Sequence, residues 1–135
     1  MLTQIINGKI FTPNGWLEGG SLILSDSKIL EIANSDLPRV GATIVDVKGD
    51  YILPGFVAMN IHGGGGKAYK EGTREAFDTA TAVHLKHGAT TIFPTIYTAK
   101  TEKIYNSAKV CEEILKEGSS PVKGIHVAGP YFNPN

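Results

Sequence analysis

The sequence predicts an α/β protein in which an all-β segment precedes a parallel α/β segment. Residues 1–50 contain short apolar runs separated by turn-forming residues, and they show no helical periodicity. Residues 51–135 instead alternate apolar, β-branched runs with segments of helical spacing. The order strand, helix, strand, helix, strand is typical of a parallel sheet joined by right-handed crossovers. We therefore expect two regions, 1–50 and 51–135.

The strands expected in the first region are short and are separated by turns. Residues 4–11 alternate in polarity around Asn7-Gly8, a pair that favours either a turn or a bulge. Residues 22–24 and 28–32 flank three turn-forming residues, which predicts a hairpin. Residues 43–47 are expected to form a further strand.

The second region begins with an apolar strand over residues 56–61. Thr73 is suited to cap a helix that runs to about residue 87, because a threonine hydroxyl can accept a hydrogen bond from a first-turn N–H group. Gly88 is expected to end that helix. Residues 89–98 are apolar and β-branched, so we expect the next strand there.

A second helix and a third strand complete the predicted pattern. Thr101 is the expected cap, and Gly118 the expected end, of a helix whose apolar positions follow helical spacing: Ile104, Ala108, Cys111 and Leu115. Residues 122–127 are expected to form the third strand. Because no following segment pairs with this strand within residues 1–135, its open edge predicts self-association with a second copy of the chain.

Composition excludes several classes of partner. Thirteen basic residues balance thirteen acidic ones, which gives no electrostatic reason to expect nucleic acid or an anionic membrane as a partner. Cys111 is the only cysteine, which excludes a disulfide framework and a cysteine zinc cluster. The start of the sequence lacks the pattern of a signal peptide, and no apolar run is long enough to span a bilayer. We therefore expect a cytoplasmic protein.

The end of the strand over residues 56–61 carries the first candidate site. Asn60 and His62 are two residues apart, so we expect their side chains on one face of the strand, together with Ala58. The remaining residues are expected to point toward covering helices: Val57, Met59 and Ile61. His62 is either a metal ligand or substrate contact, or a strand-end histidine bonded to nearby backbone. Asn60 offers only a weak amide oxygen to a metal.

Four glycines follow this strand, Gly63 to Gly66. Glycine permits positive φ and close approach of backbone N–H groups to a ligand such as a phosphate, so Gly63 and Gly64 are candidate substrate-binding residues. The pattern lacks the lysine and serine or threonine of a nucleotide-binding loop. A tight turn is the interpretation that the sequence favours. Lys70 is expected in a solvated loop, and Tyr97 is assigned either to a ligand contact or to the core.

A second motif lies at residues 124–134 and reads Gly-Ile-His-Val-Ala-Gly-Pro-Tyr-Phe-Asn-Pro. Together with residues 54–66, it resembles the first and third barrel-strand motifs of the N-acetylglucosamine-6-phosphate deacetylases, which are amidohydrolases. This resemblance covers essentially the whole chain. It implies that the first region is a small β-sandwich segment and that residues 51–135 supply the first three strands and two helices of an incomplete (β/α)8 TIM-like barrel, since a complete barrel needs roughly 250 residues.

The resemblance also implies a chemistry and shows where this chain departs from it. The family hydrolyses the acetyl group from an amino-sugar phosphate with Zn2+ or another divalent metal. Here Asn60 stands where the family often has a histidine, and Ala128 stands where it has a metal-binding glutamate. His126, two residues earlier on the same face, could supply a nitrogen to a ligand, and a core histidine bonded to a neighbour is the interpretation that the sequence favours. The family's remaining ligands and its catalytic aspartate fall beyond residue 135, so no catalytic residue is assigned within the chain.

Two functions therefore remain open on the sequence. The chain carries the pattern of a deacetylase, or it is a non-catalytic relative that acts as a binding or interaction module or has no function. Because Ala128 cannot ligate a metal, we expect the isolated chain to be inactive and to bind metal weakly or not at all.

Overall fold

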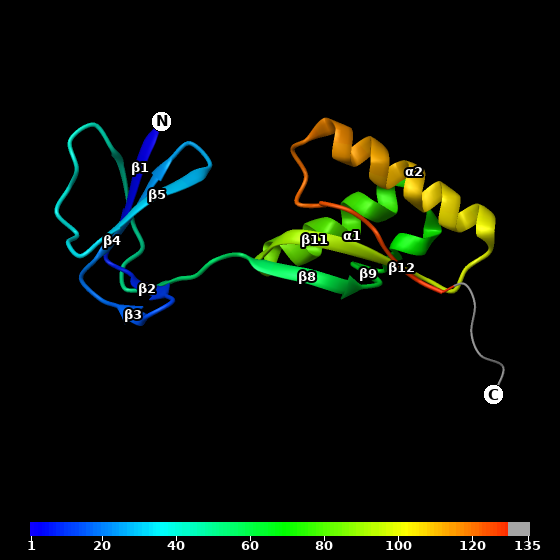
Figure 1. Cartoon of the computed structure of the whole chain (residues 1–135), viewed down its shortest axis with the longest axis horizontal. Helices are drawn as coiled ribbons and strands as arrows, with labels where there is room; N and C mark the ends of the chain where they lie inside the picture. The colour runs from blue at the N-terminus through cyan, green and yellow to red at the C-terminus, as the bar shows by residue number, and fades with distance from the viewer. Residues whose placement is uncertain (130–135) are drawn as a thin grey trace. The chain divides into compact units, whose positions relative to one another are not determined.

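The computed structural model describes residues 1–129, which divide into two units, Met1–Pro54 and a second unit that begins at Gly55 (Figure 1). The boundary expected from sequence lies after residue 50. In the structure, the short strand at Tyr51–Ile52 pairs with a strand of the first unit, so residues 51–54 belong to that unit. Within residues 1–129, no helix is both long enough and apolar enough to cross a membrane.

The first unit contains two small mixed sheets, as far as the described residues go. The larger has the strand order β5-β4-β1-β6, with bounds Lys28–Ala33, Ser21–Ser25, Leu2–Ile6 and Thr43–Asp46. The smaller has the order β3-β2-β7, with bounds Gly15–Leu17, Lys9–Thr12 and Tyr51–Ile52. Strands β4 and β5 pair antiparallel, which confirms the hairpin predicted from the sequence.

The Asn7-Gly8 pair lies where the chain passes from one sheet to the other. Asn7 has a positive φ of 56°, and β1 and β2 on either side of the pair belong to different sheets. A Cβ atom on Gly8 would lie 2.6 Å from side-chain atoms of both Val47 and Ile52. Glycine is therefore required for this close approach of the chain to its neighbours.

A buried glutamine fixes the loop between β5 and β6 to the sheet. Gln4 is 1% exposed, and its amide nitrogen donates to Ser21 Oγ at 2.9 Å and to the Leu37 carbonyl at 3.0 Å. Its amide oxygen accepts from the Arg39 backbone N–H at 2.7 Å. Because burying an unpaired amide is costly, these bonds hold the loop in one position.

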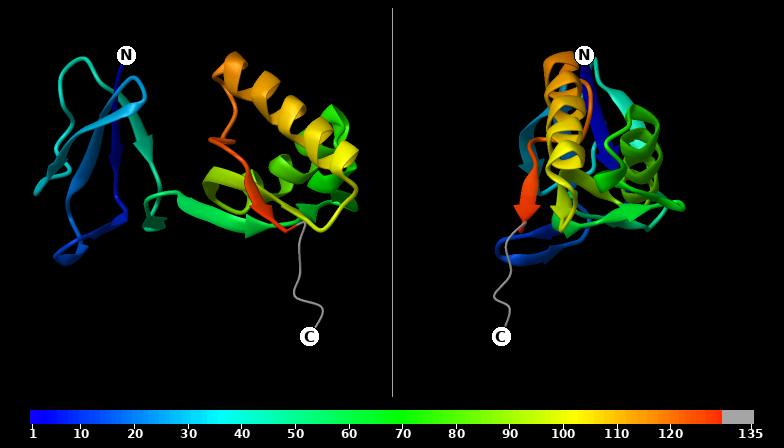
Figure 2. Two further views of the ribbon diagram at one scale, coloured as in Figure 1. Left: turned by 45° about the vertical axis from the view of Figure 1, so that its right-hand side comes forward. Right: turned by 90° about the vertical axis from the view of Figure 1, so that its right-hand side faces the viewer.

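The second unit is built on a parallel sheet with the strand order β12-β11-β8, with bounds His126–Ala128, Ala89–Tyr97 and Phe56–Ile61. A hairpin of β9 (Gly63–Gly64) and β10 (Lys67–Ala68) and a single 3-10 turn η1 (Tyr69–Glu71) follow β8. Figure 2 shows helices α1 (Arg74–Lys86) and α2 (Thr101–Glu117) on the same side of this sheet. The predicted α/β pattern is confirmed, whereas a closed barrel is not formed by residues 1–129.

The core of the second unit lies between the sheet and its two helices. It combines side chains from η1, α1, β11 and α2 that are at most 2% exposed, together with Val122: Tyr69, Phe77, Ala80, Ile96, Cys111 and Ile114. The Tyr69 and Phe77 rings meet edge to face, with centroids 5.0 Å apart. Burial raises the pKa of the Cys111 thiol, which makes it an unreactive apolar side chain.

Three details of the expected elements are wrong. The N-cap of α2 is Lys100, and Thr101 is the first helical residue. The buried face of α2 contains Ser107, Cys111 and Ile114, while Ala108 and Leu115 are exposed; the polar Ser107 is buried because its hydroxyl donates to the Tyr69 carbonyl. The third strand is short, and Val122 contributes only an isolated bridge to Ile92.

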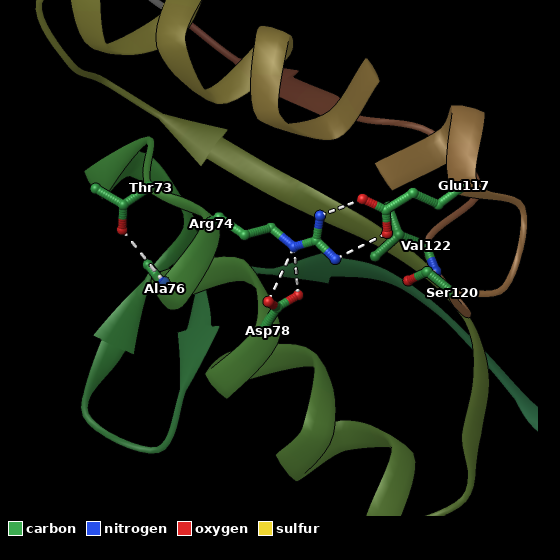
Figure 3. A network of polar contacts seen from close by, with 7 residues as sticks. All are labelled: Thr73, Arg74, Ala76, Asp78, Glu117, Ser120 and Val122. Carbon is green, nitrogen blue, oxygen red and sulfur yellow. Dashed lines mark hydrogen bonds and ion pairs between the residues drawn. The ribbon is translucent and has the colours of Figure 1, made fainter. Parts of the chain in front are cut away.

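The first helix follows its predicted signals. The Thr73 hydroxyl accepts from the Ala76 N–H at 3.2 Å, and Gly88 has a φ of 89°, so the predicted cap and end are both confirmed. Figure 3 shows how the start of α1 is joined to the end of α2. Arg74 Nε donates to the Asp78 carboxylate at 2.9 Å, and its Nη2 donates to Glu117 Oε2 at 2.8 Å.

Candidate functional site at the carboxyl ends of the parallel strands

The carboxyl ends of the three parallel strands lie at one edge of the sheet. Tyr97 at the end of β11 pairs in register with Ala128 at the end of β12, and His62 directly follows β8. This is the edge at which open α/β sheets and barrels bind ligands. The structure therefore brings His62 and Ala128, two of the positions predicted from sequence, to the same edge and places Tyr97 there as well.

A bulge in β8 changes which of its residues face the helices. Ala58 pairs with Ile92 and Ile61 pairs with Pro94, so three steps on β8 match two steps on β11. Because paired residues of parallel strands share a face, Ala58 and Ile61 both face the helices with the buried Ile92. One extra residue between Ala58 and Ile61 explains why the simple alternation of the sequence fails here.

The face of β8 that the helices leave uncovered therefore carries other residues than the sequence predicts. Val57 is 62% exposed and Met59 is 63% exposed, so the expectation that they point toward covering helices is wrong. The expectation that Ala58 lies on the open face is wrong as well. Ile61 does pack against the helix-covered core, as predicted. Asn60 is exposed, and its sharing of a face with His62 stays a prediction.

His62 lies against an aromatic ring rather than among metal ligands. Its ring meets the Tyr97 ring nearly perpendicularly, with centroids 4.8 Å apart and an interplanar angle of 74°. The His62 carbonyl accepts from the Tyr69 N–H at 3.0 Å, which joins the end of β8 to η1. The exposed imidazole is thus held at the strand edge.

The glycine run forms a hairpin that packs on α1. A Cβ atom on Gly63 would lie 2.1 Å from the Lys67 carbonyl oxygen, and one on Gly64 would lie 3.3 Å from the Ala80 carbonyl oxygen. His84 Nε2 donates to the Gly63 carbonyl at 3.0 Å. These contacts give both glycines a packing reason, which supports the tight-turn interpretation. Binding of substrate by Gly63 and Gly64 stays a prediction.

Strand β12 carries an exposed histidine, His126, two residues before Ala128. His126 pairs in register with Thr95, and the Thr95 hydroxyl lies 3.1 Å from His126 Nδ1. The same hydroxyl donates to the Met59 carbonyl at 3.4 Å, so it can accept from an Nδ1–H group of His126. His126 is thus bonded to a neighbour, as expected, but it is exposed in the described residues, so its expected place in the core is wrong.

The structure adds residues that sequence reasoning missed. The Lys70 ammonium lies 3.8 Å from the centroid of the Tyr97 ring, a cation–π contact that fixes both side chains at the strand edge. Lys70 is half-buried rather than a freely solvated loop residue. Thr95 is fully buried between β8 and β12 through its hydrogen bonds. Nothing in the local sequence indicates the Lys70–Tyr97 contact, since 27 residues separate the two.

Comparisons with known proteins identify the relatives of this arrangement. No protein-family model matches the chain. It is 27% identical over 134 residues to the N-acetylglucosamine-6-phosphate deacetylase of Haemophilus influenzae, covering 98% of the chain and 35% of that protein. The crystal structure of N-acetylglucosamine-6-phosphate deacetylase from Pasteurella multocida superposes with a TM-score of 0.90 at 25% identity, covering 99% of the chain and 36% of that structure. The chain matches the N-terminal portion of the N-acetylglucosamine-6-phosphate deacetylases.

A second relative matches a shorter stretch. The dihydroorotase of Staphylococcus aureus strain Mu50 is 34% identical over 91 residues, which is 67% of the chain and 20% of that protein. Both comparisons show that the chain spans roughly a third or less of the length of the curated relatives it matches. The motif residues Pro130 to Pro134 lie outside the described residues.

The deacetylase-type metal site does not fit the residues described here. A zinc site needs three or four nitrogen, sulfur or carboxylate donors around one point. Among residues 1–129, no group of three or more His, Cys, Asp or Glu side chains is close enough to hold a metal ion. Ala128 has no donor atom, and the imidazole of His62 contacts Tyr97. The described part of the strand edge therefore does not make a stable zinc site.

Proposed function

We propose that this chain forms the N-terminal part of a deacetylase-like (β/α) barrel that recognises an amino-sugar phosphate, and that residues 1–135 alone do not catalyse deacetylation. The observation that carries the proposal is Ala128 at the end of β12, at the same edge as Tyr97 and His62. The edge is the ligand-binding end of such a fold, and a methyl group stands at the position that the family resemblance assigns to a ligand.

The fold of the relatives supports the first half of the proposal. The deacetylase structure from Pasteurella multocida superposes on 99% of the chain with a TM-score of 0.90, and that stretch includes the three parallel strands and two helices of the second unit. A complete barrel of this kind takes roughly 250 residues, so about five more strand–helix units would be needed to close it. The small β-sandwich segment at residues 1–54 is the other part of the proposed architecture.

The few possible metal donors support the second part of the proposal, that residues 1–135 alone do not catalyse deacetylation. In amidohydrolases of this kind a divalent metal supplies an activated water and polarises the amide carbonyl. Asn60, His62 and Ala128 together offer one imidazole and one amide, which is too few donors for such a metal. We therefore propose no catalytic residue within residues 1–135. His62 and Asn60 remain the residues proposed to contact substrate.

A non-catalytic interaction module is the second candidate. It is favoured by the exposed apolar side chains of β8, Val57 and Met59, on an edge strand of the sheet. An edge strand with unpaired backbone groups pairs readily with another chain, and a second copy of this chain supplies an identical edge. We propose self-association through the open edges of this sheet: that of β12, which the sequence predicts, and that of β8. Neither nucleic acid nor membrane is proposed as a partner, and the free Cys111 fits a reducing cytoplasm.

Acetate release tests the proposal. Purified residues 1–135 are incubated with N-acetylglucosamine 6-phosphate and Zn2+, and acetate is measured against a no-protein control and against a complete deacetylase as a positive control. We expect no acetate above background and no stoichiometric zinc in a calorimetric titration. The double variant Asn60→His with Ala128→Glu restores the family ligands on two strands and is expected to remain inactive. Acetate release by that variant, or tight one-to-one zinc binding by the unaltered chain, would refute the inactivity of residues 1–135.

A further inference from the structure

The chain contains two Asn-Gly pairs, Asn7-Gly8 and Asn14-Gly15. An asparagine that precedes glycine is prone to deamidation, because the missing side chain of glycine lets its backbone nitrogen approach the asparagine side chain. In an unfolded chain both pairs are open to this reaction. In the folded chain their surroundings differ, so the fold decides which asparagine reacts.

The Asn14-Gly15 pair lies in an open turn. Pro13 and Asn14 form the two-residue loop between β2 and β3, since Thr12 pairs with Gly15. Asn14 is exposed, and a Cβ atom on Gly15 would meet no atom within 4 Å among the described residues, apart from its chain neighbours. The Thr12 hydroxyl donates to the Gly15 carbonyl at 2.8 Å and accepts from the Asn14 N–H at 3.2 Å. These bonds hold backbone groups and do not restrain the side-chain amide of Asn14.

The hairpin that carries Asn14 can open without disturbing the core. Strand β3 has only three residues and lies at the edge of the sheet β3-β2-β7. Its Trp16 side chain is 53% exposed and contacts the ring of Phe11, which is also exposed. Short edge elements with few buried contacts open locally at a small cost in free energy. Such opening frees the Gly15 nitrogen to reach the side chain of Asn14.

The Asn7-Gly8 pair, in contrast, is held in place on both sides. Asn7 Nδ2 donates to Asp46 Oδ1 at 3.0 Å, which fixes the side-chain amide. Gly8 is buried, and a Cβ atom there would lie 2.6 Å from side-chain atoms of both Val47 and Ile52. Movement of the Gly8 nitrogen toward the Asn7 side chain therefore requires the hydrogen bond and the packing to break together.

We propose that Asn14 is a site of spontaneous deamidation in the folded chain, whereas Asn7 is protected. The Gly15 nitrogen attacks Asn14 Cγ and forms a new N–Cγ bond, which closes a cyclic imide. The Cγ–Nδ2 bond breaks, and Nδ2 leaves as ammonia with the proton from the Gly15 nitrogen. Water then opens the ring. Breakage of the new N–Cγ bond gives aspartate, and breakage of the original peptide bond gives isoaspartate, in which the backbone runs through the former side chain.

Either product changes the β2–β3 turn. A carboxylate replaces the neutral amide, which adds one negative charge to a chain whose formal net charge is zero. The isoaspartate form also lengthens the backbone of the two-residue loop, which disfavours the pairing of Thr12 with Gly15. Trp16 follows this loop directly and is the only tryptophan of the chain, so its fluorescence reports on the change.

Peptide mapping by mass spectrometry measures the reaction at each pair in residues 1–135 held at pH 8 and 37 °C. We expect Asn14 to deamidate about ten-fold faster than Asn7, the factor that corresponds to breaking one hydrogen bond to a charged group first. In urea concentrations that unfold the chain, the two rates should become similar. Equal rates in the folded chain, or an equally large difference in urea, would overturn the proposal.

Variants separate local protection from general effects on the unit. Asp46→Ala removes the acceptor of the Asn7 amide and should raise the deamidation rate at Asn7 without changing that at Asn14. Asp36→Ala removes an exposed carboxylate of the same unit and is the matched control, with both rates unchanged. Asn14→Ser should abolish isoaspartate formation at the turn, with the same circular dichroism spectrum. Equal increases at Asn7 in Asp46→Ala and Asp36→Ala would refute protection by the Asn7–Asp46 bond.

Discussion

The two faces of the β8–β11–β12 sheet differ in nearly every respect. On the helix-covered face, Ile92 and Ile96 are fully buried, and Phe77 of α1 and Cys111 of α2 pack in the same core. On the opposite face, Val57 and Met59 are mostly exposed, and the polar side chains of Thr95 and His126 meet at 3.1 Å. The stability of the second unit therefore comes from one face, while the groups capable of binding lie on the other face and at its edge.

This asymmetry has a simple physical origin. Burial of apolar area stabilises by about 25 cal/mol per Å², and only the covered face gains it within residues 55–129. The opposite face keeps its polar groups satisfied locally, because the Thr95 hydroxyl bonds both the Met59 carbonyl and the His126 ring. A side chain on the opposite face can thus change with little loss of stability.

Truncation on the covered face should have the largest effect. Phe77 is 0% exposed and contacts the Tyr69 ring, so Phe77→Ala leaves a cavity and should lower the free energy of unfolding by about 3–5 kcal/mol. A loss of that size is a large part of the stability of a small domain. Urea denaturation followed by circular dichroism measures it. Met59→Ala on the opposite face is the control, with an expected change of about 0.5 kcal/mol or less. Comparable losses from the two variants would show that the faces do not differ as described.

The sequence predicts the elements of this unit far better than their faces. Residues 56–61, the Thr73 cap and the ends at Gly88 and Gly118 follow from local signals, because capping and glycine conformations depend on neighbouring residues. The faces of β8 do not follow from local signals, because the extra residue between Ala58 and Ile61 is visible only in the pairing of β8 with β11.

At the candidate site as well, the sequence predicts only what local motifs encode. The sequence indicates His62 and Ala128 because each lies in a local motif at a strand end. The Lys70–Tyr97 contact joins η1 to β11, and the buried Thr95 hydroxyl joins β8 to β12. Such contacts arise from tertiary packing, so no pattern within one segment indicates them.

Self-association should be sensitive to charge on the opposite face. Met59 is 63% exposed on edge strand β8, and Met59→Lys places an ammonium there, which disfavours edge-to-edge pairing. We expect residues 1–135 to self-associate and the variant to shift toward monomer, with an unchanged midpoint of urea unfolding. Size-exclusion chromatography with light scattering gives the mass of each. A strictly monomeric unaltered chain would exclude self-association through the edge of β8.

Removal of the Thr95 hydroxyl should have a smaller effect, although Thr95 is fully buried. Thr95→Val keeps the shape and deletes hydrogen bonds to the Met59 carbonyl and to His126. Because His126 is exposed and can bond water instead, we expect a loss of about 1 kcal/mol in the free energy of unfolding. Thr90→Val changes an exposed threonine on the same strand and should have almost no effect. A loss as large as that of Phe77→Ala would place a second stabilising core on the opposite face.

The smallest effect is expected where α1 meets α2 at the surface. The Arg74 guanidinium donates to the Glu117 carboxylate and holds the pKa of Glu117 below its ordinary value of 4.5 (Figure 3). A carboxyl group with a lowered pKa in the folded state stabilises the fold above its ordinary pKa, and this contribution is lost as the pH falls through the lowered value. Exposed ion pairs contribute little and are screened by salt.

Arg74→Met should therefore lower stability slightly at neutral pH and low salt, and the difference from the unaltered chain should vanish in acid or at high salt. Urea unfolding at pH 7 and pH 3, each at low and at high salt, measures how the difference depends on pH and on salt. Lys109→Met, which removes an exposed lysine of α2, is the control for the loss of one positive charge. A difference between Arg74→Met and the unaltered chain that is the same at both pH values would assign the effect of Arg74 to packing of its aliphatic stem rather than to Glu117.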